Sequence, residues 1–153
     1  MNPKIQFTVD RSTAAELITH LLGADSAFEP LLSSRVEIPV YAHKLHSQAV
    51  RFEAWLGEEL IGLVAAYCNQ NSRERAFVTN VSVLFKSQRQ GVSNCLMTQC
   101  INYANENRFR RLALSVDQRS VPAVALYKKF GFLVTGINET RLSMELKLEK
   151  GAE

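Results

Sequence analysis

The sequence predicts a single α/β domain with a mixed, mostly antiparallel sheet and flanking helices. Its 153 residues match the usual size of one domain. Short apolar runs separated by turn residues dominate residues 50–85, whereas helical and strand patterns alternate after residue 92. Because no repeat, low-complexity tract or Pro/Gly-rich linker divides the chain, we treat residues 1–153 as one unit.

The first third of the chain combines one strand pattern with two helical patterns. Apolar residues alternate with polar ones at the start, as in a half-buried strand. A Ser-Thr pair then offers a helix N-cap ahead of apolar residues at helical spacing, and a glycine follows them. We therefore expect a strand over 5–9, a helix from Ser12 or Thr13 to Gly23, a loop over 24–34 and a second helix over 41–48.

Three strand patterns come next, and two turns join them. The second and third patterns are apolar on both faces, which is typical of central strands that are covered from both sides. In the third, the apolar residues change from even to odd positions, and a β-bulge near Thr79-Asn80 accounts for this change. The expected strands are 50–54, 60–67 and 76–85, with turns at Gly57-Glu58 and 72–75.

Helix and strand patterns alternate in the last third. A serine and a proline open the second helical pattern of this region, and a glycine closes it. We expect a helix over 92–107, a strand over 112–116, a helix capped by Ser120 and ended by Gly131, and closing strands over 132–135 and 142–148.

The composition argues against several classes of protein. The net charge of +3, from 18 basic and 15 acidic residues, is too mild for a nucleic-acid-binding face. The longest apolar stretch, residues 61–68, is too short to cross a bilayer as a helix, so we expect no membrane partner. The three cysteines form neither an even disulfide set nor a CxxC pair, which favours reduced thiols and a cytoplasmic location. His43 and His46 have the spacing of a metal pair, but no further ligands complete a site, and we expect no metal.

The most informative segment is 81–93, where an apolar strand passes through a basic loop into a helix. The first amides of a helix lack intrahelical acceptors, and the helix dipole favours an anion there. Gly91 permits close approach of a phosphate to the backbone, while Lys86 and Arg89 add positive charge, as in a pyrophosphate cradle. The alternative is a plain strand-to-helix turn in which Gly91 only relieves strain. The glycines of a Walker A loop or a dinucleotide fingerprint are absent, which weakens nucleotide hydrolysis and hydride transfer as functions.

A second segment, 116–132, strengthens the phosphate interpretation because it places an alanine, a Leu-Tyr pair and a Gly-Phe pair at set spacing after the loop. The two segments together resemble the GCN5-related N-acetyltransferase (GNAT) family. That family has a cradle motif Gln/Arg-x-x-Gly-x-Gly/Ala and a later motif Asn-x-x-Ala-x-x-Leu-Tyr-x-x-x-Gly-Phe. The matching residues are Gln88, Gly91 and, imperfectly, Ser93 in the first motif, and Ala123, Leu126, Tyr127, Gly131 and Phe132 in the second, with Ser120 in place of the asparagine. The order of strands and helices resembles the family over nearly the whole chain.

This resemblance implies that acetyl-CoA binds as a cosubstrate where two neighbouring parallel strands splay apart, the first of them being 76–85. Two strand residues would pair with the pantetheine amides, and loop amides would hold the pyrophosphate. The implied cofactor-binding residues are Val81, Val83, Gln88, Arg89, Gln90, Gly91, Val92, Ser93 and Ser120. The acetyl group passes directly to a primary amine, and Tyr127 matches the family's usual proton donor to the departing thiolate. Otherwise Tyr127 would be a packed core ring.

The general base stays open at the level of sequence. An attacking amine must be neutral, yet an alkyl ammonium titrates near ~10.4, so a base or desolvation is required. Ser115 occupies the position where some family members have a glutamate. Glu53, Glu74 and Glu139 are the other candidates, each expected to be a solvated surface charge, and a water-relayed base is the alternative.

Three functional interpretations follow from the sequence. The chain acetylates a small-molecule amine, or it acetylates protein N-termini or lysines, or it is a non-catalytic acyl-CoA-binding module that keeps the cradle and lacks a base. Residues 24–48 and the loop 136–141 would select the acceptor. The acceptor amine, the size of the acyl group and a homodimer all stay open.

Overall fold

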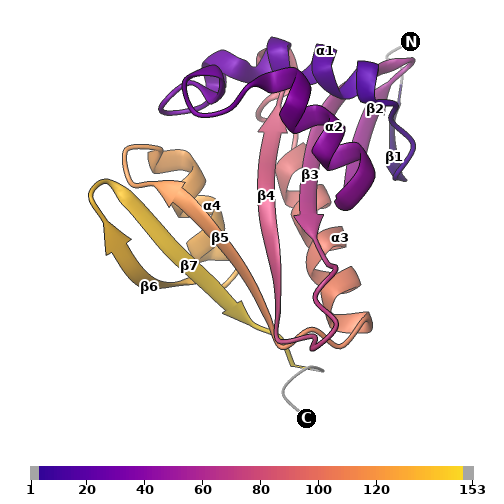
Figure 1. The fold of residues 1–153 in the computed structure, drawn as a ribbon. Helices are drawn as coiled ribbons and strands as arrows, with labels where there is room; N and C mark the ends of the chain where they lie inside the picture. Colours follow the sequence, from indigo (N-terminus) through magenta and orange to yellow (C-terminus); the bar gives the residue numbers. More distant parts are fainter. Residues whose placement is uncertain (1–3, 150–153) are drawn as a thin grey trace.

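The computed structural model describes residues 4–149, which form a seven-stranded mixed sheet with helices on both faces (Figure 1). The strands are β1 (Ile5–Val9), β2 (Val50–Leu56), β3 (Glu59–Tyr67), β4 (Arg75–Val83), β5 (Arg111–Asp117), β6 (Leu133–Asn138) and β7 (Arg141–Lys147). Their spatial order is β1-β2-β3-β4-β5-β7-β6. This architecture confirms the fold class that the sequence predicts.

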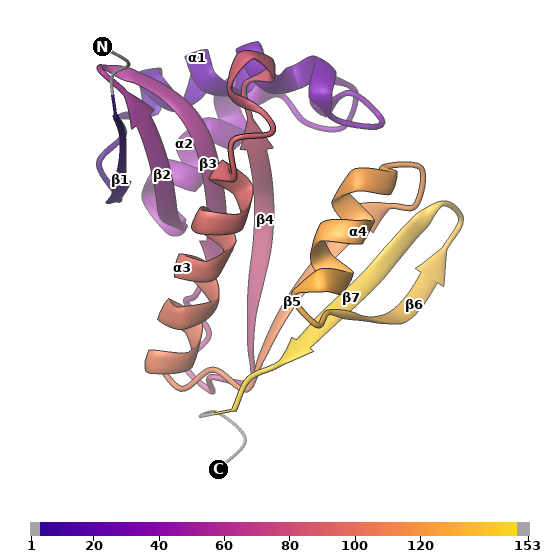
Figure 2. The same cartoon turned by 180° about the vertical axis from the view of Figure 1, so that it is seen from behind.

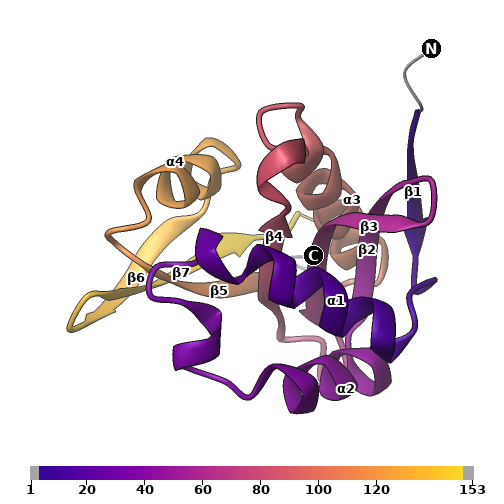
Figure 3. The same ribbon diagram turned by 90° about the horizontal axis from the view of Figure 1, so that it is seen from above.

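Helices cover the two faces of the sheet unequally. Helices α1 (Ala14–Ala24) and α2 (Ile38–Gln48) lie on one face of β2, β3 and β4, and α3 (Val92–Glu106) lies on the opposite face (Figure 2). Helix α4 (Val121–Lys129) lies on the α3 side, against β5 and β7 (Figure 3). Three short 3₁₀ turns complete the set: η1 (Asp25–Ala27), η2 (Leu32–Ser34) and η3 (Phe85–Ser87). Within residues 4–149, none of the helices combines the length and the apolar character that crossing a membrane requires.

The sheet has the outline of a V (Figure 1). Neighbouring strands pair antiparallel except β4 and β5, which run parallel. The parallel pairing joins Arg75–Val78 to Arg111–Leu114 and stops there, although both strands continue. Strands β5, β7 and β6 therefore turn away from β4 and form a second arm.

Apolar side chains fill both faces of the first arm. Phe52 and Leu96 pack between the sheet and α3, and Trp55 and Leu63 pack between the sheet and α1 and α2. Each of these side chains is at most 2% exposed. Because successive strand residues point to opposite faces, burial on both sides requires the continuous apolar run that identifies β3 in the sequence.

The start of α1 shows how two neighbouring polar residues take different roles. Thr13 is the N-cap, and it forms a capping box with Glu16 in which each side chain accepts from the other residue's amide. The hydroxyl of Ser12 instead donates to the buried carboxylate of Glu53. Gly23, expected to end the helix, lies inside its last turn.

Other boundaries differ from the expected ones for local reasons. Helix α2 begins at Ile38, earlier than expected, because Pro39 suits a first helical turn. The expected loop over 24–34 contains η1 and η2, and β4 ends at Val83 because the chain turns into η3. Ser120 occupies the N-cap position of α4, but its side chain makes no capping hydrogen bond, so the expected cap is wrong.

Candidate active site

A cleft of about 510 Å³ opens between the two arms of the V. Residues 78–83 of β4 form one wall, and residues 114–117 of β5 form the other. The first turns of α4 border the cleft on one side of the sheet. Residues 27–29 and Arg35, in the connection between α1 and α2, border it on the other side.

A bulge in β4 lies where the cleft begins. Two consecutive residues of β3, 65 and 66, pair with Asn80 and Val78, so Thr79 has no partner on β3. The hydroxyl of Tyr41 in α2 donates to the Thr79 carbonyl at 2.8 Å and lies 2.8 Å from its hydroxyl. The predicted bulge is thus confirmed, and pairing with β5 ends at the residue before it.

Beyond the bulge, β4 turns backbone groups toward the cleft. The Leu84 amide donates to the Ile61 carbonyl of β3 at 2.9 Å. Since backbone groups alternate in direction along a strand, those of Val81 and Val83 point away from β3. The side-chain amide of Gln88 donates to the Val83 carbonyl at 3.3 Å, which agrees with this direction.

The loop between β4 and α3 leaves a run of amides without acceptors. The Gln88 amide donates to the Phe85 carbonyl at 3.2 Å, and the next bonded amide is that of Cys95, which donates to Gly91 at 3.0 Å. The amides of residues 89–94 therefore have no acceptor among residues 4–149. Gly91 adopts φ +76°, and a Cβ placed there would meet no atom within 4 Å. Donors and space for an anion coincide at this helix N-terminus.

The cofactor-binding residues implied by the sequence divide into two groups. Val81, Val83, Gln88, Ser93 and Ser120 line the cleft. Arg89, Gln90 and Gly91 are exposed in the loop, and the Val92 side chain is buried in the core, so this part of the loop offers chiefly backbone amides. Lys86, expected to add charge to the cradle, pairs with Glu59, so its charge is already matched.

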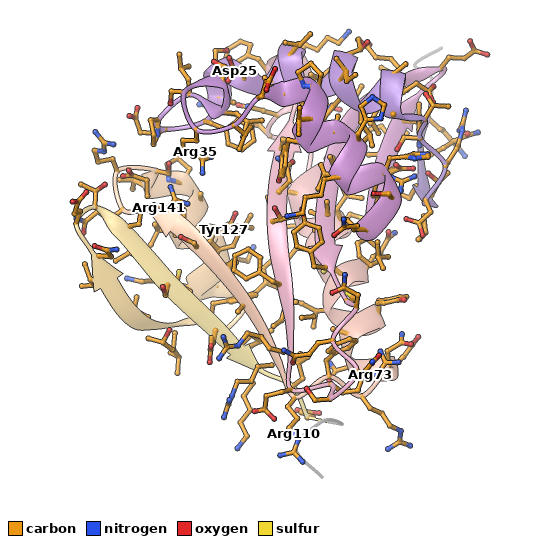
Figure 4. The ribbon with its side chains drawn as sticks, viewed as in Figure 1. Asp25, Arg35, Arg73, Arg110, Tyr127 and Arg141 are labelled. Atoms are coloured by element: carbon orange, nitrogen blue, oxygen red, sulfur yellow. The ribbon has the colours of Figure 1, made fainter. Side chains whose placement is uncertain are left out.

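Tyr127 projects from α4 toward the cleft between the arms (Figure 4). Its side chain is 7% exposed, and its ring meets that of Phe132 edge-on with centroids 6.0 Å apart. No residue of the described chain forms a hydrogen bond with its hydroxyl, although a core tyrosine ordinarily has such a partner. Burial raises the pKa of Tyr127 to about 12. The hydroxyl therefore keeps its proton at neutral pH.

The glutamates considered from sequence lie outside the cleft. Glu53 is fully buried in β2, where it accepts from Ser12 and lies 3.3 Å from the Arg51 guanidinium. The expectation of a solvated charge is therefore wrong for Glu53. Its carboxylate is buried because Ser12, from a distant segment, and Arg51, on the same strand, supply its partners. Glu74 forms a surface ion pair, and Glu139 lies in the turn between β6 and β7.

Two other carboxylates do line the cleft, and both are already paired. Asp117 accepts hydrogen bonds of 2.9–3.0 Å from the Arg119 amide and guanidinium and from the Thr140 hydroxyl. These bonds, those from Arg119 first, hold the pKa of Asp117 well below its usual range. Glu29 lies 3.8 Å from the Arg119 guanidinium. Over residues 4–149, no group of three or more His, Cys, Asp or Glu side chains could hold a metal ion.

A polar chain behind the β4 wall was not singled out from sequence. His20 of α1 is 2% exposed, with Nδ1 2.9 Å from the Leu60 carbonyl and Nε2 2.8 Å from the Ser82 hydroxyl. Ser82 also contacts Asn80, whose buried amide nitrogen has no partner among the described residues. Burial lowers the pKa of His20 to about 4. The sequence did contain a signal for this chain: His20, Asn80 and Ser82 are polar residues at interior positions of otherwise apolar patterns.

The sequence matches the model of the acetyltransferase (GNAT) family over residues 16–132. The match runs from α1 to the end of α4 and includes both motifs found in the sequence. No curated protein matches the sequence significantly.

Solved structures with this fold include three that were determined as acetyltransferases. The ribosomal-protein-S18-alanine N-acetyltransferase of Escherichia coli has a TM-score of 0.75 at 16% identity, covering 94% of this chain and 95% of its own. The PaiA N-acetyltransferase of Thermoplasma acidophilum, in complex with coenzyme A, has a TM-score of 0.71 at 14% identity, covering 93% of this chain and 99% of its own. NAA60 of Arabidopsis thaliana, in complex with a bisubstrate analogue, has a TM-score of 0.73 at 17% identity, covering 96% of this chain and 99% of its own. At these identities the similarity shows the fold.

Proposed function

The chain belongs to the acetyltransferase (GNAT) family, and we propose that it moves an acetyl group from acetyl-CoA to a primary amine. Family membership makes it an acetyltransferase by class, as the sequence predicts. The observation that carries the finer proposal is the run of unpaired amides at 89–94 beside a cleft that a free tyrosine hydroxyl enters. An anion cradle and a proton donor thus border one space.

Acetyl-CoA carries its acetyl group as an activated thioester at the end of a pantetheine arm and a pyrophosphate. The amides of residues 89–93 and the dipole of α3 would hold the pyrophosphate, and Arg89 would add charge. Val81 and Val83 would pair with the pantetheine amides in the manner of an added strand. Gln88, Ser93 and Ser120 would offer polar groups along this path.

We propose direct transfer without a covalent enzyme intermediate. The amine nitrogen bonds to the acetyl carbon as the carbon–sulfur bond breaks, and the sulfur leaves as a thiolate. The thiolate takes the proton of the Tyr127 hydroxyl, which solvent then replaces. The burial that raises the pKa of Tyr127 also raises the basicity of a thiolate beside it, so the two groups stay matched.

Water removes the proton of the amine in this proposal. Asp117 and Glu29 are the carboxylates at the cleft, and Arg119 already engages both, so neither is a ready base. A partly buried cleft favours the neutral form of an entering amine by desolvation. The reaction would take place in the cytoplasm, where the free thiols of Cys68, Cys95 and Cys100 stay reduced.

A protein N-terminus is the second candidate acceptor. One similar structure is that of an enzyme named for acetylating the alanine of ribosomal protein S18, which favours this alternative over other macromolecular acceptors. A non-catalytic acyl-CoA-binding module is the rival from another class.

The deciding experiment measures free thiol released from acetyl-CoA by the purified chain, with panels of small amines and of peptides. Amine-dependent release supports the proposal, and the better panel identifies the acceptor class. Binding of acetyl-CoA without release under any amine favours the non-catalytic module. Failure to bind acetyl-CoA contradicts both.

The cradle is tested with Gly91→Ala and a matched control, Gly57→Ala in the turn between β2 and β3. Both glycines have positive φ, +76° and +62°, and an added Cβ meets no atom within 4 Å at either. The two variants therefore carry similar backbone strain. We expect Gly91→Ala alone to weaken CoA binding by about tenfold or more, the size of one lost hydrogen bond to a charged group. Equal CoA affinities in the two variants would reject the cradle.

A further inference from the structure

Two arginines from distant parts of the chain meet on one side of the cleft. Arg35 follows η2 in the connection between α1 and α2, and Arg141 is the first residue of β7. Both line the cleft, and Figure 4 shows them next to one another above Tyr127 at the open end of the V. Neither belongs to the motifs that identify the family.

Arg141 is held in place by the neighbouring strand. Its Nε donates to the Ser115 hydroxyl at 3.0 Å, and its Nη2 donates to the Ser115 carbonyl at 3.1 Å. These two bonds leave further N–H groups of a rigid, planar donor available to the cleft. The side chain is therefore preorganised to donate, and little rotamer entropy would be lost on binding a ligand.

The two guanidinium groups lack a compensating carboxylate. Within residues 4–149, neither arginine has a carboxylate oxygen within 4.0 Å. Burial and the charge of Arg35 lower the pKa of Arg141, and the charge of Asp117 offsets this only in part. Arg35 is exposed and Arg141 is half-buried, and a bound anion would relieve the repulsion between these two like charges.

The carboxylates near this pair already have other partners. Asp117 accepts from Arg119 and Thr140, and Glu29 lies 3.8 Å from Arg119. The three arginines of this region carry one more charge than its two carboxylates, so the mouth of the cleft keeps an excess of positive charge. A polycationic amine would be repelled from this position.

The pair is separate from the phosphate cradle. The cradle lies at the N-terminus of α3, whereas Arg35 lies in the connection between α1 and α2, and these helices occupy opposite faces of the sheet (Figures 1 and 2). An anion between Arg35 and Arg141 would therefore come from the second substrate and not from the pyrophosphate of CoA.

We propose that the acceptor amine carries its own anionic group, a carboxylate or a phosphate, which Arg35 and Arg141 hold while the amine points toward Tyr127. This inference rests on the proposed acetyl transfer and names its substrate class. A guanidinium fork matches a carboxylate or phosphate with two parallel hydrogen bonds, so the pair selects for the anion as well as orienting the amine.

The test compares matched acceptors in the thiol-release assay. The pairs are β-alanine and its amide, phosphoethanolamine and ethanolamine, and peptides with an acidic or a neutral second residue. We expect kcat/KM to be about 10- to 100-fold higher for the anionic member, because one hydrogen bond to a charged group contributes about that much. The pair with the largest ratio identifies the source of the anion.

The variants Arg35→Gln, Arg141→Gln and their combination should lower kcat/KM for the anionic member by a similar factor, so that the ratio between the anionic and the neutral member falls toward one. Arg35→Glu should reverse the preference toward a cationic acceptor. Arg110→Gln is the control, because Arg110 is 61% exposed at the far end of the molecule (Figure 4). Arg141→Lys, which keeps the charge without the fork, should restore part of the preference.

Each possible outcome decides the inference. Equal use of anionic and neutral acceptors overturns it while the proposed acetyl transfer stands. Tenfold weaker CoA binding by the double glutamine variant also overturns it, because the arginines would then hold the phosphates of CoA. If CoA binds but no amine is acetylated, the melting temperature of the CoA-saturated chain is measured with increasing β-alanine. A rise in the melting temperature of the parent that the double variant lacks supports the inference, and no rise in the parent overturns it. Failure to bind acetyl-CoA overturns it together with the proposed function.

Discussion

Helices cover both faces of the arm formed by β1–β4, whereas in the arm formed by β5–β7 the covering helix is α4, on one face (Figure 3). In β3 all residues between the two ends are buried, but in β6 none is. Leu133 and Ile137 of β6 are 72% and 68% exposed. The first arm therefore contributes most of the apolar burial, and the second contributes less to stability than its length suggests.

The less covered arm nevertheless carries much of the proposed chemistry. Tyr127 and Arg141 both belong to it, and the well-packed arm supplies the cradle and the β4 backbone. The arms are joined by parallel pairing over only four residues of each strand, Arg75–Val78 and Arg111–Leu114. A cleft at such a joint can adjust its width without disturbing the main core.

The largest expected effect separates activity from stability in the second arm. Tyr127→Phe keeps the ring and its contact with Phe132 but removes the transferable proton. We expect kcat to fall by about 10²- to 10⁴-fold, with the melting temperature and acetyl-CoA affinity nearly unchanged. Steady-state turnover and a binding titration provide the measurement. Parental turnover by the variant would leave Tyr127 as a core aromatic only.

The next effect compares the two arms directly by making the same Leu→Ala substitution in each of them. Leu63→Ala removes a fully buried side chain of β3, and we expect a loss of about 2–5 kcal/mol in the free energy of unfolding. Leu133→Ala in β6 should change it by less than about 0.5 kcal/mol. Urea titration of both variants gives the two values. Similar losses would show that the arms are equally important to stability.

Local patterns predicted the order of strands and helices because each depends on neighbours in the chain. Gly57 and the phase change at Thr79 are signals of this kind. The family motifs likewise lie in two short segments. The limits of helices proved less certain, as at Gly23, because the last turn depends on what it packs against.

Long-range partners explain the features that the sequence did not predict. Glu53 looks like a surface charge until the fold brings Ser12 beside it. Arg35 and Arg141 meet only because the α1–α2 connection and β7 border the same cleft. The periodicity of apolar residues along the chain contains no information on contacts between such distant residues.

A pH effect on the free energy of unfolding should arise in the covered arm between pH 6.5 and pH 4. The pKa of His20 falls from its ordinary 6.5 to about 4 on folding, because burial disfavours the charged ring. Between these values the unfolded chain binds more protons, so stability is lost as the pH falls from 6.5 to 4. The loss attributable to His20 is about 3 kcal/mol.

The measurement is the free energy of unfolding of the parent and of His20→Gln across this range. The carboxylates that also titrate are common to both proteins, so the difference between the two curves reports His20. The parent should lose its advantage as the pH falls. Parallel curves would contradict a neutral, buried His20.

The smallest effect tests whether acetyl-CoA joins the two arms. If it binds the folded chain selectively, a hundredfold excess over its dissociation constant adds about 2.7 kcal/mol of stability. Because the cleft walls are β4 and β5, the added protection against hydrogen exchange should be concentrated in β5 and α4, the less covered arm. Melting and exchange are measured with and without CoA. An unchanged melting temperature would contradict selective binding, and protection limited to the loop before α3 would show that the ligand contacts one arm alone.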